Sequence, residues 1–546
     1  MKATISMLLI VLGFSTQAMA DGVKEFKMSF GQKLSNQKVD GNVTVNTSIN
    51  TSNQVVVGKD YYAADTHGFS KLPSPSLVTP LSLGYVKFGG NLHSVYNWEL
   101  NAYFDLYENS FSYVSSPLER RMQLVQNYYH AKPMFQVNMM GFQPEVDQDG
   151  NFSLQESATA ETAGQAIAYL NGEKKLGVNN ILMGNEPFHW ESTHGKALPS
   201  ADEYIEKFIE YVMELKKAQE KSGGDPSALK IWGPELATGW VGWQTTHPDD
   251  CQVDYTLPEK MKCSYGDGKF SEFMPYFLSR IAEFESDEKM NPFGYKLLDF
   301  VTFHYYPLFR TSFADEGSII TDANGNEDVP GMLESVNLWD NDSYINKYDA
   351  ASPKGVQPKI IKKFQNWMKM FYPQAELAVT EYGIDSADKI AYHPIVRPLY
   401  LADLMARVAA TGVATFTKSF LQSGSDAGNP WSLIDGTNKT HLYNVYSLYS
   451  NNFLGSVLES KDSFGDQVNV YSVKNSTETN IFLVNKDAVA HTTGVKLNTT
   501  LSVGEIALPA WSMTVLKVPN ANRGDIKVLQ YGAKEMGITI PAAYIK

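Results

Sequence analysis

Short apolar runs alternate with longer segments of helical periodicity from about residue 83 to residue 428. The best-marked helical segment covers residues 201–221, which follow Ser200 and end before Gly223. The apolar runs are typical of strands that are buried on both faces, as in a parallel sheet. A weaker run lies at 109–116, and the well-marked runs are 84–91, 134–141, 179–187, 229–235, 299–307, 375–383 and 414–423.

This alternation predicts an α/β fold, a TIM-like (β/α)8 barrel in which each strand is followed by a covering helix. A doubly wound parallel sheet is the alternative. It is disfavoured because no glycine-rich phosphate-binding loop follows any of the runs.

The two flanking regions have the pattern of an all-β module. Residues 42–50 alternate apolar and polar positions, and short apolar runs separated by turns fill 453–518. Residues 59–80 contain several prolines and predict a loop. We expect the N-terminal strands to complete a C-terminal β-sandwich, because chain ends often lie close together. The predicted segments are a signal peptide (1–20), N-terminal strands (21–62), the barrel (63–440), the β-sandwich (441–519) and a tail of unassigned role (520–546).

The N-terminus predicts export from the cell. Lys2 precedes the short apolar run SMLLIVLGF, and Ala18-Met19-Ala20 fits a signal-peptide cleavage site, with cleavage after Ala20. The run is too short to span a bilayer, so we expect a secreted or periplasmic protein without a membrane segment. In an exported chain the two cysteines, Cys251 and Cys263, favour one disulfide; two buried free thiols are the alternative.

Charge and composition limit the classes of molecule that the protein is expected to bind. The formal net charge is −14 and there are no basic clusters, so we expect no nucleic-acid partner. With 30 Tyr, 28 Phe and 9 Trp, the chain has aromatic rings enough for both a core and a sugar-binding cleft. We therefore expect a polysaccharide substrate, and a monomer.

Two of the predicted strands end in a glutamate, Glu186 in ILMGNE and Glu381 in LAVTE. Catalytic residues of barrels lie at the carboxyl ends of strands. An ion pair with an inward Lys or Arg could explain one such glutamate, but two together favour a catalytic pair. Glycoside hydrolysis needs two carboxyl groups across a cleft, one to protonate the leaving oxygen and one to attack the anomeric carbon. Asn185, beside Glu186, is suited to bind a sugar hydroxyl.

Several ordered motifs resemble glycoside hydrolase family 44, the endoglucanase and xyloglucanase family. They are KFGGNLHSVYNWELN (87–101), GNEPFHWESTH (184–194), DPSALKIWGPELATGW (225–240), LLDFVTFHYYP (297–307), TEYG (380–383) and LYNVYSLYSNN (442–452). The resemblance implies a TIM-like barrel with a β-sandwich, a retaining mechanism and β-1,4-glucan substrates. It implies that Glu186 is the general acid/base and Glu381 the nucleophile. It implies no required cofactor, and a structural Ca²⁺ ion is compatible with it.

The chain departs from the family pattern near the proposed site. Lys87 and Phe88 stand where the family usually has Arg and Trp, and Thr302 stands where it usually has Asp. Lysine cannot make the planar, two-pronged contact of arginine with a carboxylate. Both glutamates are retained, so we expect activity, and the departures concern which polysaccharide is bound.

Further side chains are predicted to contact substrate or to orient the glutamates. His304 and Tyr305 or Tyr306 end the sixth strand, where one could orient the nucleophile or simply pack. Glu235 ends the fifth strand, where it could bind substrate or neutralise a neighbouring charge. His247, Asp249 and Asp250 are read as solvated loop residues, and no metal site is assigned. The other candidate substrate contacts are Asn91, Asn97, Trp98, Trp240, Trp243, Tyr382 and Trp431.

The leading hypothesis is a secreted, retaining endo-β-1,4-glucanase. The nearest alternatives are a xylanase, a mannanase or a marine-polysaccharide hydrolase on the same scaffold, and a transglycosylase that uses the same two glutamates. A carbohydrate-binding protein without activity is the alternative of a different class, and the intact glutamate pair argues against it.

Overall fold

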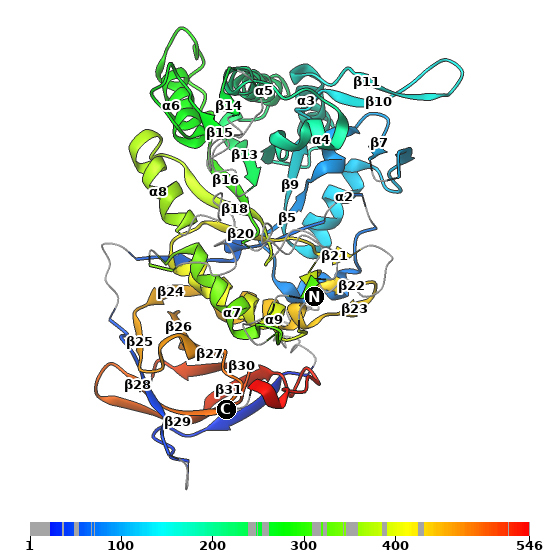
Figure 1. Ribbon diagram of the computed structural model, residues 1–546. Helices are drawn as coiled ribbons and strands as arrows, with labels where there is room; N and C mark the ends of the chain where they lie inside the picture. Colours follow the sequence, from blue (N-terminus) through cyan, green and yellow to red (C-terminus); the bar gives the residue numbers. More distant parts are fainter. Residues whose placement is uncertain are drawn as a thin grey trace, which may run out of the picture.

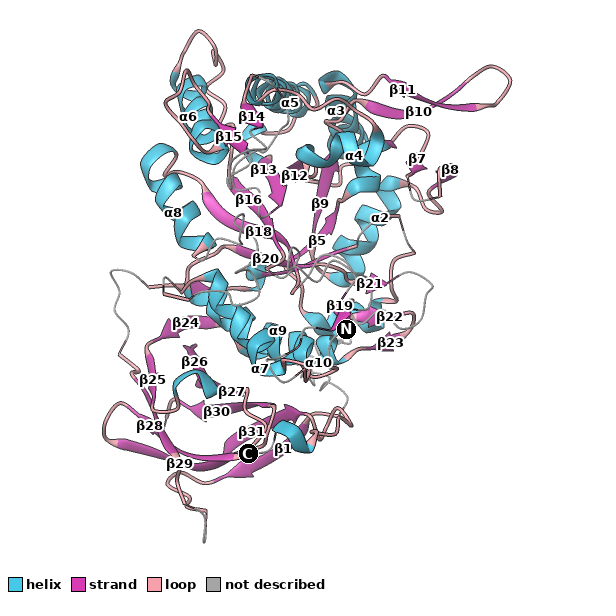
Figure 2. Ribbon diagram, viewed as in Figure 1, coloured by secondary structure: helices cyan, strands magenta, loops and turns pink. Residues whose placement is uncertain are grey.

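The computed structural model describes residues 22–544 except 35–37, 49–53, 67, 70, 107, 238–246, 248, 254–260, 308–317, 320, 322–324, 342, 345–358, 385–389, 392, 424–430 and 522–523. Two parts stand out in Figures 1 and 2, a barrel ringed by helices and a β-sandwich. Among the described residues, the helices are all too short or too polar to cross a membrane.

Eight parallel strands close the barrel, which confirms the predicted TIM-like fold. Their order around it is that of the chain. The strands are β4 (Tyr62–Asp65), β5 (Tyr85–Phe88), β9 (Lys132–Val137), β12 (Asn180–Met183), β13 (Lys230–Ala237), β16 (Phe300–Tyr305), β18 (Glu376–Tyr382) and β20 (Thr415–Lys418).

One barrel strand differs from the prediction. Residues 109–116 are not the eighth strand; they contain β8 (Ser110–Tyr113), the edge of a small sheet with β6 (Tyr96–Asn97) and β7 (Ala102–Asp105). The eighth strand is β4, within the segment predicted as a loop. All four of its residues are buried, but its sequence YAAD has two alanines and an aspartate and so gives no apolar run.

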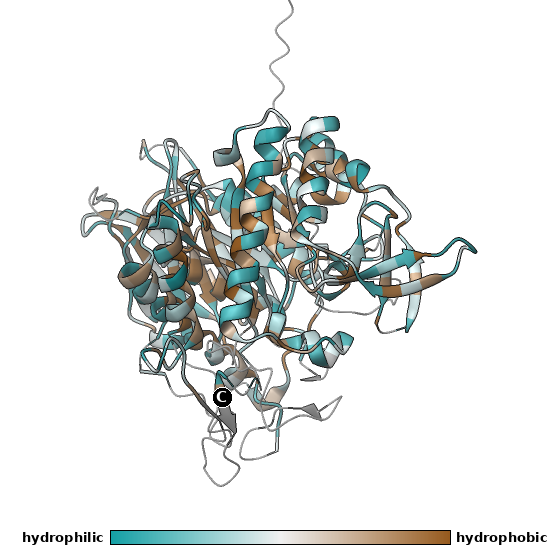
Figure 3. Cartoon of the chain, turned by 90° about the horizontal axis from the view of Figure 1, so that it is seen from above, coloured by the Kyte–Doolittle hydropathy of each residue, from teal (hydrophilic) through white to brown (hydrophobic). Residues whose placement is uncertain are grey.

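The helices cover the outside of the barrel with their apolar faces. In α5 (Ala201–Lys221), the predicted helix, the Ser200 hydroxyl accepts from the Glu203 amide and the Glu203 carboxylate accepts from the Ser200 amide. Figure 3 shows hydrophilic colours on the outer turns of the helices and apolar colours toward the strands. The other long helices are α2 (Leu118–Leu124), α3 (Ala160–Ile167), α6 (Phe273–Ser286), α8 (Ile360–Phe371), α9 (Val396–Ala410) and α10 (His441–Asn452).

The β-sandwich joins both ends of the described chain, as predicted. One sheet has the order β1-β31-β30-β27-β26-β24-β3 and the other β25-β2-β28-β29. The strand β31 lies in the segment that was given no role, and α10 lies in the segment predicted to be all-β. The strands are β1 (Lys24–Met28), β2 (Gly41–Val45), β3 (Val56–Val57), β24 (Gly455–Leu458), β25 (Ser460–Asp462), β26 (Val468–Lys474), β27 (Glu478–Asn485), β28 (His491–Leu497), β29 (Leu501–Leu508), β30 (Ser512–Pro519) and β31 (Ile526–Gly532).

A buried polar network joins the barrel to the β-sandwich. Asp403 of α9 accepts hydrogen bonds from Asn469 at 2.7 and 2.8 Å, from the Tyr471 hydroxyl and from Lys486 at 2.9 Å. Burial opposes the charge on Asp403, but Lys486 and Arg407 outweigh it and lower the pKa of Asp403 to about 2. The barrel and the sandwich are thus held by a charge cluster as well as by apolar packing.

Three insertions extend the carboxyl-end face of the barrel. The sheet of β6, β7 and β8 lies between β5 and α2. The hairpin of β10 (Phe142–Val146) and β11 (Phe152–Glu156) lies between β9 and α3, and it projects beside β7 in Figure 1. The pair β14 (Cys251–Val253) and β15 (Met261–Cys263) lies between β13 and α6. Such connections carry the functional residues of barrel enzymes.

Candidate active site

Glu186 and Glu381 come together at the carboxyl ends of their strands. Glu186 follows β12 in a left-handed conformation (φ 38°), which turns the chain into a short helix at Pro187–His189. Glu381 is the penultimate residue of β18. One carboxylate oxygen of each lies within 4.8 Å of the other and of a ring nitrogen of His304. Their side chains are 13% and 10% exposed, so both line a surface that a substrate can reach.

His304, at the end of β16, bridges the carboxylates. Its Nδ1 lies 2.8 Å from Glu186 Oε1 and 3.5 Å from Glu381 Oε2, and its Nε2 lies 3.1 Å from Glu235 Oε2. A neutral imidazole has one N–H, whereas the cation donates from both nitrogens. Burial disfavours the cation, but Glu381 and the hydrogen bonds to Glu186 and Glu235 outweigh burial and raise the pKa of His304 to about 10. His304 is therefore cationic at neutral pH.

Lys87 of β5 is the second buried cation. Its Nζ lies 2.7 Å from Glu381 Oε1, 3.2 Å from Glu235 Oε2 and 3.5 Å from Asp65 Oδ2, and its side chain is fully buried. Burial opposes the charge, yet the three carboxylates together raise the pKa of Lys87 above its ordinary value. Gly89 leaves room for it, because a Cβ at that position would lie 2.6 Å from Lys87 Cε.

Glu235 contacts both buried cations, Lys87 and His304. It is fully buried near the end of β13, in a left-handed conformation (φ 57°). Its carbonyl accepts from the Glu186 amide at 3.0 Å, and its amide donates to the Thr302 hydroxyl at 2.9 Å. Burial opposes its charge, but Lys87 and His304 lower the pKa of Glu235. Between the two predicted roles, the geometry matches neutralisation of a neighbouring charge.

Tyr306 completes the surroundings of Glu381. Its hydroxyl donates to Glu381 Oε2 at 2.8 Å and lies 3.0 Å from the Ser419 hydroxyl at the end of β20. Burial, with Glu381 and Glu186 nearby, raises the pKa of Tyr306 well above its ordinary value, so the group stays a donor. Glu381 therefore receives Lys87 on one oxygen and Tyr306 on the other, which fixes its orientation.

Asn185 and Asn91 lie beside Glu186 and contact each other. The side-chain amide of Asn185 donates to Asn91 Oδ1 at 3.0 Å. The backbone carbonyl of Asn185 accepts from the Trp190 ring N–H at 3.1 Å. Within the described part of the chain, Asn185 Oδ1 has no hydrogen-bond partner. This oxygen is suited to accept a hydrogen bond from a substrate hydroxyl.

Asn97 and Trp98 use their polar groups inside the protein. Asn97 donates to the Pro144 carbonyl and accepts from the amides of Glu99 and Leu100. The Trp98 ring donates to the Thr162 carbonyl at 3.1 Å. Both side chains tie the first insertion to the second and to α3, which is a structural role.

The remaining aromatic candidates are buried and pack against other rings. Tyr305 packs edge-on against Trp339 with ring centroids 4.5 Å apart, and Tyr382 stacks on Phe416 at 3.7 Å. Trp431 is 4% exposed and packs against Phe420. Trp240 and Trp243 lie outside the described residues.

A metal ion would compete with the hydrogen bonds of this site. Glu186, His304 and Glu381 each offer one donor atom in a group compact enough for an ion. Metal binding requires a neutral imidazole, whereas the carboxylates here favour the protonated form of His304. The arrangement fits a network of hydrogen bonds better than a metal centre.

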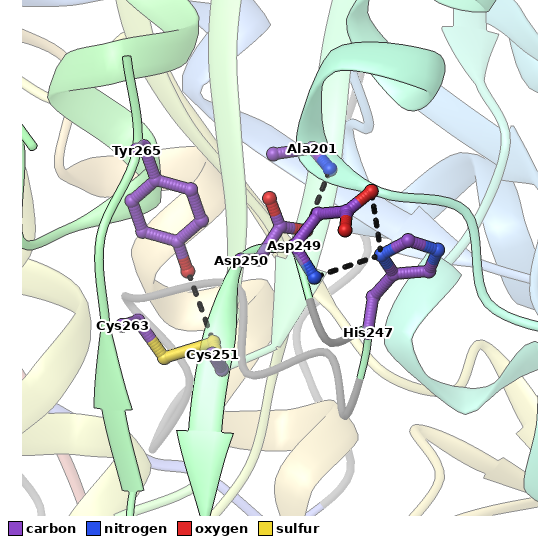
Figure 4. Close-up of a disulfide and its surroundings, with 7 residues drawn as sticks. All are labelled: Ala201, His247, Asp249, Asp250, Cys251, Cys263 and Tyr265. Atoms are coloured by element: carbon purple, nitrogen blue, oxygen red, sulfur yellow. Dashed lines mark hydrogen bonds and ion pairs between the residues drawn. A yellow bond between two sulfur atoms is a disulfide. The ribbon is translucent and has the colours of Figure 1, made fainter. Parts of the chain in front are cut away.

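Asp250 is not the solvated loop residue that was expected: it is 8% exposed and binds the start of α5 (Figure 4). Asp250 accepts from the Ala201 amide at 2.7 Å, and His247 Nδ1 lies 3.7 Å from Asp249. Cys251 and Cys263 form a disulfide across the antiparallel pair of β14 and β15, with 4.0 Å between their Cα atoms. The Tyr265 hydroxyl lies 3.8 Å from Cys251 Sγ.

Four residues of this site are absent from the predicted site residues: Lys87, Asp65, Thr302 and Ser419. Lys87 was noted only as a departure from the family pattern. The available signal was a charged residue inside an apolar run, YVKF, and an aspartate that closes a buried strand, YAAD. A charge within a barrel strand requires a partner, because an unpaired buried charge is very costly.

Residues 129–308 match the sequence model of glycoside hydrolase family 44. Endoglucanase A of Paenibacillus lautus is 24% identical over 348 residues, which is 58% of this chain and 41% of that protein. The β-mannanase/endoglucanase A of Caldicellulosiruptor saccharolyticus is 24% identical over 276 residues, 47% of this chain and 18% of that protein. The chain thus spans less than half the length of these curated relatives.

Solved structures of family 44 enzymes share the fold of this chain. The family 44 endoglucanase Cel44A from Clostridium thermocellum has a TM-score of 0.62 at 15% identity, covering 90% of this chain and 100% of that one. A Paenibacillus polymyxa family 44 xyloglucanase, solved with xyloglucan, has a TM-score of 0.63 at 15% identity, covering 90% and 99%. The sequence match over residues 129–308 agrees with the resemblance drawn from the motifs, and the solved structures show that the fold is shared.

Proposed function

We propose that this glycoside hydrolase, whose sequence and fold match family 44, is a retaining endo-β-1,4-glucanase that acts on a cellulose-type or xyloglucan-type polysaccharide. The observation that carries the proposal is the separation of the carboxyl groups. Retention needs the two groups about 5–5.5 Å apart, whereas inversion needs about 6.5–9.5 Å to admit a water molecule. The distance of at most 4.8 Å between oxygens of Glu186 and Glu381 supports retention.

In the first step Glu186 protonates the glycosidic oxygen while Glu381 attacks the anomeric carbon. The bond to the leaving sugar breaks, and a glycosyl ester forms on Glu381. In the second step Glu186 takes a proton from water, the water oxygen bonds to the anomeric carbon, and the ester bond to Glu381 breaks. Two displacements restore the original β configuration.

The surrounding charges suit these steps. Lys87 and Tyr306 hold Glu381 as an oriented, ionised nucleophile. Besides Glu186, which holds the proton in the first step, three carboxylates, Asp65, Glu235 and Glu381, lie around the two cations Lys87 and His304. The excess of negative charge favours the positive charge that develops on the sugar ring in the transition state.

An activity panel tests the substrate class. Reducing-sugar release is measured on carboxymethylcellulose, xyloglucan, mannan and xylan. We expect release from the glucans; release from mannan or xylan alone would replace the proposed substrate. If none of the four is cut while binding persists, the chain is a binding protein for glycans of these types.

Variants test the roles of the glutamates. Glu381→Gln should abolish turnover on every substrate. Glu186→Gln should lower kcat/KM, which reports the first step, by about 10²–10⁴-fold on polysaccharide, and much less on an aryl glycoside whose leaving group needs no proton. Glu191→Gln is the matched control, because Glu191 is exposed in the same connection. Unchanged rates in Glu381→Gln would refute the nucleophile assignment.

Export and independence from metal ions are part of the proposal. The N-terminal sequence of the protein recovered outside the cytoplasm should begin at Asp21, and an uncleaved Met1 would contradict the signal peptide. Both steps use only side chains, so activity should survive exhaustive dialysis against a chelator. Loss of thermal stability on dialysis would indicate a structural Ca²⁺ ion.

A further inference from the structure

Four aromatic rings form a cluster on the outer part of the two insertions that follow β5 and β9. Phe111 stacks on Phe152 with ring centroids 5.3 Å apart, Tyr113 meets Phe152 edge-on at 5.2 Å, and Phe104 lies 5.0 Å from Phe111. Tyr113 is 64% exposed and the other three are half-buried. We call Phe104, Phe111, Tyr113 and Phe152 the aromatic platform.

The strand geometry explains how the platform forms. Phe111 and Tyr113 are two residues apart on β8 and therefore share a face of the sheet. Phe104 is the partner of Phe111 across the β7–β8 pair, and Phe152 comes from β11 of the neighbouring hairpin. Contiguous exposed aromatic surface of this kind marks a binding site more often than chance exposure.

The platform lies on the same face of the barrel as the glutamates. Both insertions leave the carboxyl ends of barrel strands, as Glu186 and Glu381 do. The insertion with β7 and β8 also supplies Asn91, which contacts Asn185 next to Glu186.

The hairpin is joined to the acid/base connection as well. Lys196, in the segment after Glu186, forms an ion pair with Glu156 of β11 and lies 5.2 Å over the ring of Phe142. The two insertions that carry the platform are therefore each tied to the segment that carries Asn185 and Glu186.

Resting on the proposed function, we propose that the aromatic platform binds sugar units of the polysaccharide substrate at a distance from the cleavage point. Flat apolar rings pack against the C–H faces of sugar rings, while polar residues beside them bind hydroxyl groups. The nearby acids Asp147, Asp149 and Glu156 disfavour an anionic polysaccharide, so the ligand is a neutral β-linked glycan.

Alanine at Tyr113 and Phe152 together tests the platform. Tyr128→Ala is the matched control: Tyr128 is 59% exposed, but it lies just before the start of β9, at the opposite end of the barrel. Mobility in gels that contain hydroxyethylcellulose or xyloglucan reports polymer binding. The ratio of kcat/KM on these polymers to kcat/KM on 4-nitrophenyl β-cellotrioside reports long-chain recognition.

We expect polymer binding and the kcat/KM ratio to fall about fivefold to tenfold in the double variant, because it removes two of the four rings. Tyr113→Ala alone should lower polymer binding and the kcat/KM ratio by a smaller factor. Tyr113→Phe keeps the ring and should leave both unchanged, so a loss in the alanine variants is due to the missing rings. An unchanged kcat/KM ratio in an active double variant would overturn the proposal that the aromatic platform binds sugar units. A change of oligomeric state in gel filtration would overturn it in favour of self-association. If no polymer is cleaved but the double variant alone loses binding, the platform stands and the proposed hydrolysis fails.

Discussion

Replacing Lys87 with methionine removes a charge from the centre of the site at nearly constant side-chain length. Lys87 is the cation closest to Glu381, with Nζ 2.7 Å from Oε1, and it also faces Glu235 and Asp65. The variant removes one cation from beside Glu235 and Glu381 and leaves His304 next to both. A carboxylate that loses a neighbouring cation keeps its proton to higher pH. Glu381 must be ionised to attack, so the acidic limb of kcat/KM should move upward.

The distances give the size of the effect. Opposite unit charges 2.7 Å apart attract by about 6 kcal/mol at an effective dielectric constant of about 20, which is an upper bound. A hydrogen bond to a charged group has a net value of about 1.5–3 kcal/mol. At about 1.36 kcal/mol per pH unit, the limb should move by about 1–2 units. Loss of one partner of a buried ion pair also costs about 3–5 kcal/mol of stability at neutral pH. This cost should shrink at lower pH as the carboxylates take up protons.

The assay is kcat/KM against pH on a soluble glucan, with thermal unfolding at each pH to confirm that the variant is folded. Lys87→Arg retains the charge and should leave the limb in place. Lys132→Met is the matched control, because Lys132 begins the neighbouring strand and is 55% exposed in its pair with Asp60. A folded Lys87→Met variant with an unmoved acidic limb would refute the role of Lys87 in ionising Glu381.

Three further predictions concern other parts of the molecule. Asp403→Asn should lower the unfolding free energy by about 3–5 kcal/mol at pH 7, because it leaves Lys486 buried without its carboxylate. The folded pKa of Asp403 is about 2, below the ordinary 3.8. The ionised carboxylate therefore contributes about 2 kcal/mol of stability above pH 4, and this contribution is lost as the pH falls through 2. An equal effect of the substitution at pH 7 and at pH 2 would contradict this pH dependence. Tyr306→Phe should lower kcat about 10- to 100-fold, since it removes a hydrogen bond to the nucleophile; an unchanged kcat would rule out that role. A thiol assay on the unfolded, unreduced protein should find no reactive cysteine, and two after reduction; thiols before reduction would contradict the disulfide.

The barrel was predictable because most of its strands are buried on both faces and so appear as apolar runs. The exception, β4, is short and built partly of alanine, and its burial comes from the strands and helices around it. Whether a short segment becomes a barrel strand depends on the strands that pair with it. The local pattern of apolar and polar residues does not contain that information. For the same reason a run of half-buried aromatic residues at 109–116 looked like a barrel strand.

The two glutamates were predictable from their place at strand ends, and so were His304, Tyr306 and Glu235 as candidate neighbours, but Lys87 and Asp65 were not. Lys87, Asp65 and Glu235 meet only because β5, β4 and β13 converge at one end of the barrel. Conversely, Asn97 and Trp98 looked like sugar contacts, yet their partners come from distant elements, Pro144 and Thr162. Residue type indicated the chemistry available, and closure of the barrel decided which groups meet.

The most direct test of the account is the anomeric configuration of the first product. Proton NMR of a glucan digest in its first minutes distinguishes the two anomers before they interconvert. With oxygens of Glu186 and Glu381 no more than 4.8 Å apart, the account predicts that the β anomer forms first and the α anomer appears later by mutarotation. An α anomer as the first product would mean a single displacement by water, and would contradict Glu381 as nucleophile.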